Sequence, residues 1–452
     1  MSSPIPSKAE KAAAASQPSR WWPEWLKHDL LYLLAGRAIR SFAQGYLLII
    51  VPLYLSMLGY DAEHLGILFA ASAATSAILV AAIGVLSDRF GRKTLLILIS
   101  LMTAGGGVVF ALSSNFLVLV AGAALGTIGR GGGVGSGGAW GPYYPAEQAL
   151  IAEQASDRQR TTIFGVISFV GVIASALGSL LAYMPQLMQR FAGLTLIDGY
   201  RGLFALTALL GIAMALIVLP VHESHRHAHP EPRSRHPQLT PQRGPRRLFG
   251  ISLSRESWHL ISRFMITNSI NGLAIGMLGP FIVYWFYRRY GVGAGTLGGL
   301  FFFMNLIAAV PYLSAGRLAA RMGAVGAVVW TRGISVILLL VLAVMPTFTL
   351  AAIVFGIRMV FNTLSLPVRQ SYLMGVIRPS ERASAAGLAN LPMHAASSVT
   401  PYFAGYLMQY IALSLPLEIA AVLMGLNTAL YYIFFRNIRP PEEIVAEQAN
   451  SS

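Results

Sequence analysis

The chain has 452 residues, of which 55% are hydrophobic and 11% are charged, and its formal net charge is +15. This composition excludes an ordinary soluble domain, in which about a quarter of the residues are charged. The chain contains no cysteine, which excludes disulfides and cysteine-ligated metal sites.

Long apolar segments follow one another along almost the whole chain. Each is long enough to cross a bilayer core of about 30 Å as a helix. They predict an all-α membrane protein with twelve transmembrane helices. The first six spans are expected at 30–58, 65–87, 94–112, 116–146, 161–184 and 200–220, and the second six at 260–287, 295–318, 324–345, 347–376, 383–411 and 414–435.

Basic residues predict the orientation of these spans. If the N-terminus is cytoplasmic, most Lys and Arg outside the spans fall in cytoplasmic segments, and Arg190, Arg201, Arg288 and Arg289 fall on the other side. Because cytoplasmic loops are enriched in Lys and Arg, we expect a cell-membrane protein with both termini in the cytoplasm. The positive charge is spread over many loops, so no nucleic-acid partner is expected.

One polar segment divides the chain into two halves. Residues 221–254 are rich in Arg, His and Pro, too polar to pack as a span. The expected organisation is a cytoplasmic tail at 1–28, a six-helix bundle at 29–220, the linker at 221–254, a second bundle at 255–436 and a tail at 437–452. The linker is interpreted as a tether, with contact to anionic lipid as an alternative. Its His225, His227 and His229 imply no fixed geometry, so no metal site is expected.

A dense run of charge, Gly84-Val-Leu-Ser-Asp-Arg-Phe-Gly-Arg-Lys93, lies between the second and third spans. Such charge cannot sit in hydrocarbon, so the run predicts a tight loop at the membrane surface. A weaker copy, Gly316-Arg-Leu-Ala-Ala-Arg-Met-Gly323, occurs in the second half. Later, Pro145-Ala-Glu-Gln148 is matched by Pro367-Val-Arg-Gln370. The two halves therefore look like copies of one unit.

The charged run resembles the loop signature of the major facilitator superfamily, G-x-L-[AS]-D-[RK]-x-G-[RK]-[RK]. The resemblance implies two pseudo-symmetric six-helix bundles that open alternately to either side, with spans 1, 4, 7 and 10 around a central cavity. It implies a gating loop made by Gly84, Asp88, Arg89, Gly91, Arg92 and Lys93. The gating partners expected for this loop are Glu147, Glu153, Arg158 and Arg382, with the two glutamates facing Arg89 or Arg92.

Seven arginines fall within the expected spans: Arg37, Arg40, Arg130, Arg263, Arg332, Arg358 and Arg369. Each deep arginine costs about 2.5–3.5 kcal/mol on insertion scales, so it should face water or a partner. Counted from the span ends, Arg40, Arg130 and Arg358 are deep. Arg37, Arg263 and Arg369 are expected to reach the cytoplasmic surface. Arg332 is intermediate in depth, and the family resemblance implies a peripheral position for its span, the ninth.

Polar residues repeat at helical spacing on the cavity spans. The expected substrate-cavity residues are Arg40, Gln44, Arg130, Arg263, Asn271, Arg358, Asn362 and Arg369. Glu147 is the only carboxylate clearly inside a span, so the cavity is expected to be electropositive. An organic phosphate or carboxylate fits such a cavity, because guanidinium groups bind these anions through two hydrogen bonds. The alternative is that the arginines have structural or gating roles.

The fourth and fifth spans bear on drug export. Arg130 resembles the span-four arginine of drug–proton antiporters, but the Gln of that pattern is missing. The glycine-rich run 129–138 predicts a kinked or partly unwound helix, with close helix packing as the alternative. On span five, Ser179 follows Gly178 where the antiporter signature ends in Gly-Pro. These departures weaken an antiporter interpretation.

The sequence therefore favours an alternating-access transporter of a small organic solute, polar or anionic. The alternative is proton-coupled export of hydrophobic or cationic compounds, and a further one is a transporter-like sensor without transport. Glu147 and His394 are the candidates for coupling. The expected partners are a small-molecule substrate, H⁺ or a counter-solute, and membrane lipids, with the protein a monomer. No catalytic residue set is apparent, so neither an enzyme nor a cofactor is expected.

Overall fold

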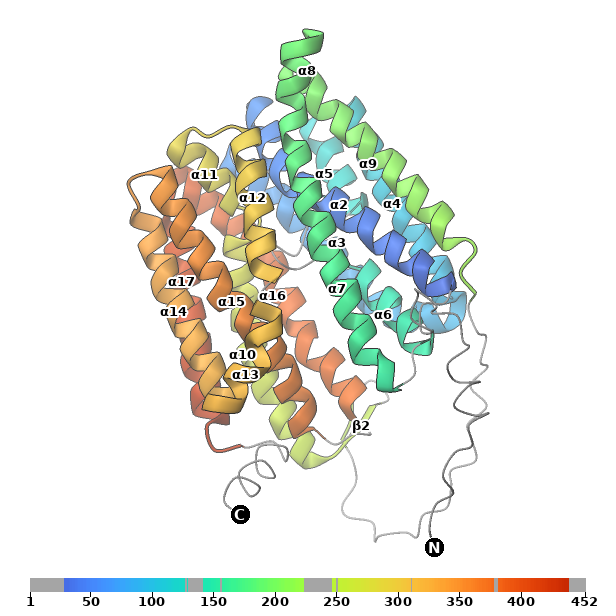
Figure 1. Cartoon of the computed structure of the whole chain (residues 1–452), viewed down its shortest axis with the longest axis vertical. Coiled ribbons are helices and arrows are strands. Elements are labelled where there is room, and N and C mark those ends of the chain that lie inside the picture. Colours follow the sequence, from blue (N-terminus) through green and yellow to red (C-terminus); the bar gives the residue numbers. More distant parts are fainter. Residues whose placement is uncertain are drawn as a thin grey trace, which may run out of the picture.

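The structure, a computed structural model, describes residues 28–126, 128, 141–154, 157–222, 246–248, 251–309, 311–377 and 381–438. In these residues the fold is built from long helices and one short hairpin (Figure 1). The first half contains α2 (His28–Met57), α3 (Ala62–Phe90), α4 (Arg92–Leu112), α5 (Phe116–Gly126), α6 (Tyr143–Gln154), α7 (Asp157–Leu180), the 3₁₀ turn η1 (Leu181–Tyr183), α8 (Met184–Ala192) and α9 (Leu196–Val218).

The second half begins with the antiparallel hairpin of β1 (Arg246–Leu248) and β2 (Ile251–Leu253). Its helices are α10 (Arg255–Leu278), α11 (Ile282–Tyr290), α12 (Ala294–Ala309), α13 (Pro311–Met322), α14 (Ala324–Val344), α15 (Phe348–Val376), α16 (Arg382–Tyr410) and α17 (Leu415–Phe435). Prolines mark several of the breaks. Pro280, for example, lacks an N–H and lies in the turn between α10 and α11.

Each of the twelve expected spans coincides with one helix or with two consecutive helices. Among the described residues, nine helical segments are long and apolar enough to cross a membrane, and α5 and α12 are shorter apolar helices. The fourth span comprises α5 and α6, and its glycine-rich centre lies outside the described residues. The outer surface exposes large apolar side chains, as hydrocarbon requires; examples are Ile78, Leu125, Phe169, Leu216, Ile337 and Ile433.

The charged run after the second span is not a loop, as the sequence predicted, but mostly helix. Helix α3 continues to Phe90 and α4 begins at Arg92, so the turn is confined to Gly91. Gly91 has φ 81° and ψ 149°, a backbone conformation that residues other than glycine rarely adopt. Gly323 joins α13 to α14 in the same way, with φ 71° and ψ 158°. The weak sequence copy in the second half therefore reproduces the backbone turn of the first.

Close helix contacts within each half are also repeated. In the first half Gly45 of α2 lies against the backbone of Ser175 on α7, and a Cβ at position 45 would clash with it. In the second half Gly272 of α10 lies in the same way against Met393 on α16. Small residues at both crossings let the backbones approach, which is how helices associate in a bilayer.

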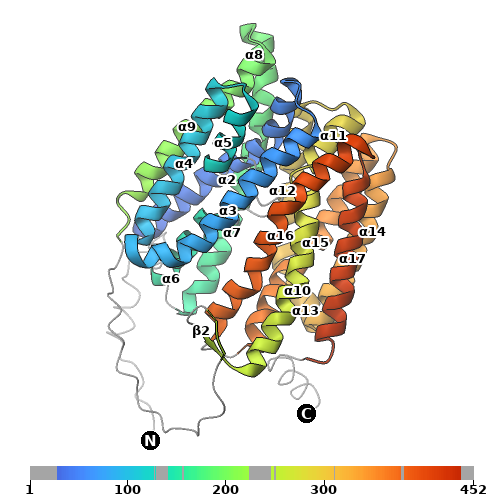
Figure 2. The same cartoon turned by 180° about the vertical axis from the view of Figure 1, so that it is seen from behind.

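The two halves contact each other at the end away from the described chain ends (Figures 1 and 2). A Cβ at Gly66 of α3 would lie 2.7 Å from the carbonyl oxygen of Pro401 on α16, and Gly405 lies against Ala62. Across the same end, a Cβ at Gly298 of α12 would lie 2.6 Å from the carbonyl oxygen of Ser179 on α7. Toward the other end, where α6, α10 and α13 lie, the ribbons of the halves diverge.

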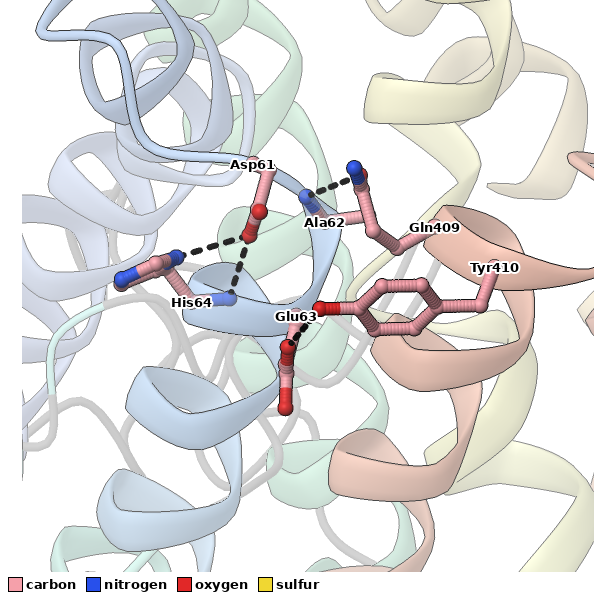
Figure 3. A network of polar contacts seen from close by, with 6 residues as sticks. All are labelled: Asp61, Ala62, Glu63, His64, Gln409 and Tyr410. Carbon is pink, nitrogen blue, oxygen red and sulfur yellow. Dashed lines mark hydrogen bonds and ion pairs between the residues drawn. The ribbon is translucent and has the colours of Figure 1, made fainter.

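Hydrogen bonds join the halves beside these glycines (Figure 3). The Tyr410 hydroxyl donates to Glu63 Oε2 at 2.7 Å, and the Ala62 N–H donates to Gln409 Oε1 at 3.4 Å. Asp61 caps α3 by accepting from the His64 backbone N–H at 3.1 Å, and it contacts His64 Nδ1 at 2.7 Å. Partial burial alone would raise the pKa of Asp61, but the hydrogen bonds from His64 outweigh it and hold this pKa below its usual value.

The glycine contacts predict the effect of added bulk. We expect Gly298→Val to disfavour this conformation by about 1–3 kcal/mol, because the new side chain meets the Ser179 backbone, which cannot turn aside. Since the chain has no cysteine, spin labels can be placed at Leu194 with Thr349 and at Thr94 with Met322. In Gly298→Val, the distance between the two labels, measured by electron paramagnetic resonance, should lengthen for the first pair and shorten for the second.

Gly299→Val is the matched control, because a Cβ at Gly299 meets no heavy atom within 4 Å. If Gly298→Val and Gly299→Val gave the same distance distributions, the close contact would have no part in holding the halves together.

Candidate functional site

A buried ion pair links α2 to α6 in the first half. Arg37 Nη1 lies 3.3 Å from Glu147 Oε2, and the two side chains are 2% and 0% exposed. Arg40, one turn along α2, is also buried, and its guanidinium stacks 5.0 Å from the ring centroid of Tyr143. The Arg37 guanidinium lies 5.1 Å from the ring of Tyr144. Their spacing of three residues, a little less than one helical turn, places both arginines on the face of α2 that meets α6.

This arrangement corrects two sequence predictions. Arg37 does not reach the surface, because its counter-charge lies inside the bundle. Glu147 makes its ion pair with Arg37, whereas the sequence led us to expect Arg89 or Arg92 as its partner. The aromatic pair Tyr143 and Tyr144 was missed, although it directly precedes the Pro145 motif. A desolvated guanidinium is stabilised by stacking on an aromatic ring. Two adjacent tyrosines in a span that also faces buried arginines could therefore have been recognised from the sequence as their partners.

A small cavity of about 10 Å³ lies beside Arg40. Gln44, Thr103 and Tyr143 contribute to its lining. This is the volume of about one water molecule, so the cavity is a gap between packed polar side chains and is too small for an organic solute. Gln44, an expected substrate-cavity residue, therefore lies inside the first half in this conformation.

The second half contains three arginines in polar surroundings. Arg358 of α15 is 3% exposed and approaches the Met424 sulfur at 3.6 Å. Arg369, on the same helix, donates to Asn268 Oδ1 at 2.7 Å, and its guanidinium lies 5.8 Å from the ring of Tyr431. Arg369 is half-buried and forms its hydrogen bond with α10, whereas the sequence led us to expect its side chain at the cytoplasmic surface.

Arg332 also belongs to this interior and not to the periphery, where the sequence led us to expect it. It is 4% exposed, and it donates to Asn271 Oδ1 at 2.8 Å and to the side-chain oxygen of Asn427. Asn427 in turn donates to the Thr267 carbonyl oxygen. The family resemblance implied a peripheral span nine, but Arg332 lies on the inward face of α14 and meets α10 and α17 there.

The charge balance differs between the halves. In the first half, Glu147 forms an ion pair with the buried Arg37. From residue 255 to residue 438 the chain contains three acids, Glu256, Glu381 and Glu418, each within or next to the first turn of a helix. Among the described residues, no carboxylate forms an ion pair with Arg332, Arg358 or Arg369. Amide, thioether and aromatic groups are the partners found there instead.

The structure describes only some of the remaining expected site residues. Arg263 is exposed and donates to the Phe434 carbonyl oxygen at 3.1 Å, near the end of α17. Asn362 and His394 are half-buried on α15 and α16, and Arg92 and Lys93 are half-buried at the start of α4. Arg130 lies outside the described residues, as do the side chains of Gly84, Asp88, Arg89, Glu153, Arg158 and Arg382. The cavity and gating roles stay predictions.

Comparison with known proteins identifies the class of this fold. The family model described as the Major Facilitator Superfamily matches residues 33–366 and 264–451, so the chain belongs to that superfamily of membrane transporters. Its fold is the one the sequence resemblance implied.

Particular relatives are distant. The chain is 27% identical over 369 residues to the multidrug resistance protein MdtG of Proteus mirabilis, covering 78% of this chain and 82% of that protein. It is 24% identical over 398 residues to an uncharacterized membrane protein of Saccharomyces cerevisiae, covering 84% and 88%. Among solved structures, a bacterial homolog of the human lysosomal transporter Spinster, inward-facing and unoccupied, superposes with TM-score 0.69 at 13% identity, covering 92% of this chain and 98% of that one.

The buried ion pair predicts an energetic coupling between α2 and α6. We expect Glu147→Gln to destabilise the protein by about 3–5 kcal/mol, because it leaves Arg37 buried without a counter-charge. The loss should shrink by at least about 1 kcal/mol in an Arg37→Met background, where that charge is gone. Thermal unfolding followed by the fluorescence of the seven tryptophans measures both.

Arg263→Met supplies the control background, since Arg263 is exposed and far along the chain from Glu147. In the Arg263→Met background, Glu147→Gln should lower the free energy of unfolding by as much as it does in the unmodified protein. An equal cost in the Arg37→Met background would mean that the ion pair does not stabilise the fold.

Proposed function

We propose that this protein moves a small organic solute across the cell membrane by alternating access, with a polar or anionic solute as the first choice. In this proposal both termini are cytoplasmic, so the end where the halves diverge faces the cytoplasm. The glycine contacts of α3 with α16 and of α7 with α12 would then close the outer side. Solute would enter from the cytoplasmic side in this conformation and leave or exchange after the halves rock the other way.

One observation supports the substrate class: buried guanidinium groups outnumber buried carboxylates on the helices expected around the centre. Among the described residues of these helices, Arg37, Arg40 and Arg358 are buried and Arg369 is half-buried, and Glu147 is the one buried carboxylate. A guanidinium in a low-dielectric interior attracts an anion far more strongly than one in water. Phosphate and carboxylate groups match its paired donors. We propose that Asn271, Asn362, Gln44, Arg130 and Arg263 extend this polar route as the conformation changes.

The ion pair on α6 suggests how transport is coupled. If Glu147 takes up a proton, its attraction to Arg37 is lost, and the contact between α2 and α6 weakens. The state of this pair would then depend on which side of the membrane it faces, which couples H⁺ or a counter-solute to the rocking of the halves. His394, half-buried on α16, is the second candidate for this role.

Export of hydrophobic or cationic compounds is the second candidate function. It is supported by the relatives named for multidrug and quinolone resistance, MdtG and NorA. A buried glutamate is compatible with proton-driven export of this kind. The two candidates share the fold and the coupling pair, and they differ in the charge of the solute.

The substrate class is tested by ligand panels on purified protein. We expect saturable rises in the unfolding temperature with organic phosphates or carboxylates, since a ligand at 100 times its Kd stabilises the folded state by about 2.7 kcal/mol. A stabilising ligand should then show saturable counterflow in proteoliposomes, which a sensor without transport would not show. Stabilisation by lipophilic cations alone would overturn the first choice in favour of the second.

The gating loop yields a separate expectation. Asp88→Asn should abolish exchange of the solute found by that panel while leaving membrane insertion and folding intact, because the substitution removes charge at the turn between α3 and α4. Asp198→Asn, at the first turn of α9 on the opposite end, is the control and should exchange normally. Unchanged exchange rates in Asp88→Asn would count against a gate at this turn.

A further inference from the structure

The interior of the second half contains hydrogen-bond donors that meet no acceptor in the described structure. Arg332 Nε, Arg358 Nε, Ser335 Oγ and Tyr431 Oη are all buried, and none has a hydrogen-bond partner among the residues described. A buried donor without an acceptor costs about 1–3 kcal/mol, and more when the donor is charged. Four such groups in one bundle call for an acceptor that the described protein does not supply.

These groups lie at similar depth on helices that pack together. Ser335 is one turn after Arg332 on α14, so the two project from one face. Arg332 is about 12 Å from the start of α14 and Arg358 about 15 Å from the start of α15, which runs the opposite way. Both lie well inside the bundle. Arg332 is near enough to interact electrostatically with Arg358, Arg369 and Tyr431.

Comparison of the halves indicates what the missing acceptor is. In the motif Pro-x-x-Gln, the first half has Glu147 at the position where the second half has Arg369. The first half therefore includes a counter-anion for its arginines. The second half adds another cation at the same place, and its acids are confined to helix ends. Like charges this close and this deep repel strongly unless an anion lies among them.

We propose that the second half binds a compact anion, a halide or an oxyanion, between α14, α15 and α17, with Arg332, Arg358 and Ser335 as its ligands and Tyr431 as a further donor. The anion takes the place that Glu147 occupies in the first half. The anion has two possible sources, a free inorganic ion or the acidic group of the transported solute. Only the second of these, the acidic group of the solute, rests on the proposed function.

The test uses purified full-length protein in a buffer whose salt is the bulky sulfonate MES, with phosphate, chloride or an organic phosphate or carboxylate replacing MES at constant ionic strength. The unfolding temperature should rise saturably with phosphate or chloride. The rise should vanish in Arg358→Met and Arg332→Met, which remain foldable because an apolar side chain of similar length is tolerated in place of a buried charge. Ser335→Ala should raise the half-saturating concentration about fivefold, the loss expected for one hydrogen bond.

Arg288→Met is the matched control, since it removes an exposed arginine from the same half, and it should keep the full anion response. A response to inorganic ions indicates a resident anion, and a response to organic phosphates or carboxylates alone indicates the solute's acidic group; both support the site. No anion response in the unmodified protein, or an equal response in Arg358→Met and Arg332→Met, would overturn it. Counterflow is measured in a separate experiment, so a protein that binds the anion but shows no counterflow would contradict the proposed transport function and not the anion site.

Discussion

The structure depends on how charged side chains are stabilised away from water. Moving an arginine into a bundle of helices costs several kcal/mol unless hydrogen bonds and an opposite charge replace its hydration. The first half meets this requirement with one carboxylate: Glu147 pairs with Arg37, and two tyrosine rings cover the guanidinium groups of Arg37 and Arg40. The pair holds α6 against α2.

The second half has the same fold but a different electrostatic arrangement. Asparagines, a methionine and a tyrosine surround Arg332, Arg358 and Arg369, and none of them neutralises a positive charge. The backbone repeat is nevertheless close, since Gly91 and Gly323 make the same one-residue turn and Gly45 and Gly272 make the same helix crossing. Duplication has therefore kept the positions where only glycine fits, while the buried charges have diverged. The two proposals, a proton-responsive pair in the first half and an anion site in the second, would give the halves different roles in a transport cycle.

Much of the fold follows from the sequence, because a bilayer imposes simple rules. Length and apolarity predicted spans that each coincide with one described helix or with two, and nine helical segments among the described residues are long and apolar enough to cross a membrane. The doubled loop signature predicted the two halves. The errors came where local pattern had to predict a partner on another helix. Depth counted from a span end placed Arg37 at the surface, and the family resemblance implied a peripheral place for Arg332. Both failed because neither spacing nor resemblance shows what packs on a given face of a helix. The charged run was expected as a loop because charge disfavours hydrocarbon, yet a helix that extends past the bilayer satisfies the same rule with its backbone bonds intact. The gating residues and Arg130 lie in parts of the chain that the structure does not describe in full, and their roles rest on resemblance.

The central claim is that the space between the halves is reached from one side of the membrane at a time. A single cysteine at Asn362 tests it directly, because the chain has no other cysteine and Asn362 is half-buried on α15. In sealed vesicles a membrane-impermeant thiol reagent should label it from the cytoplasmic side in the resting protein, and from the outer side during exchange. Labelling from both sides at once, or from neither side under any condition, would contradict alternating access.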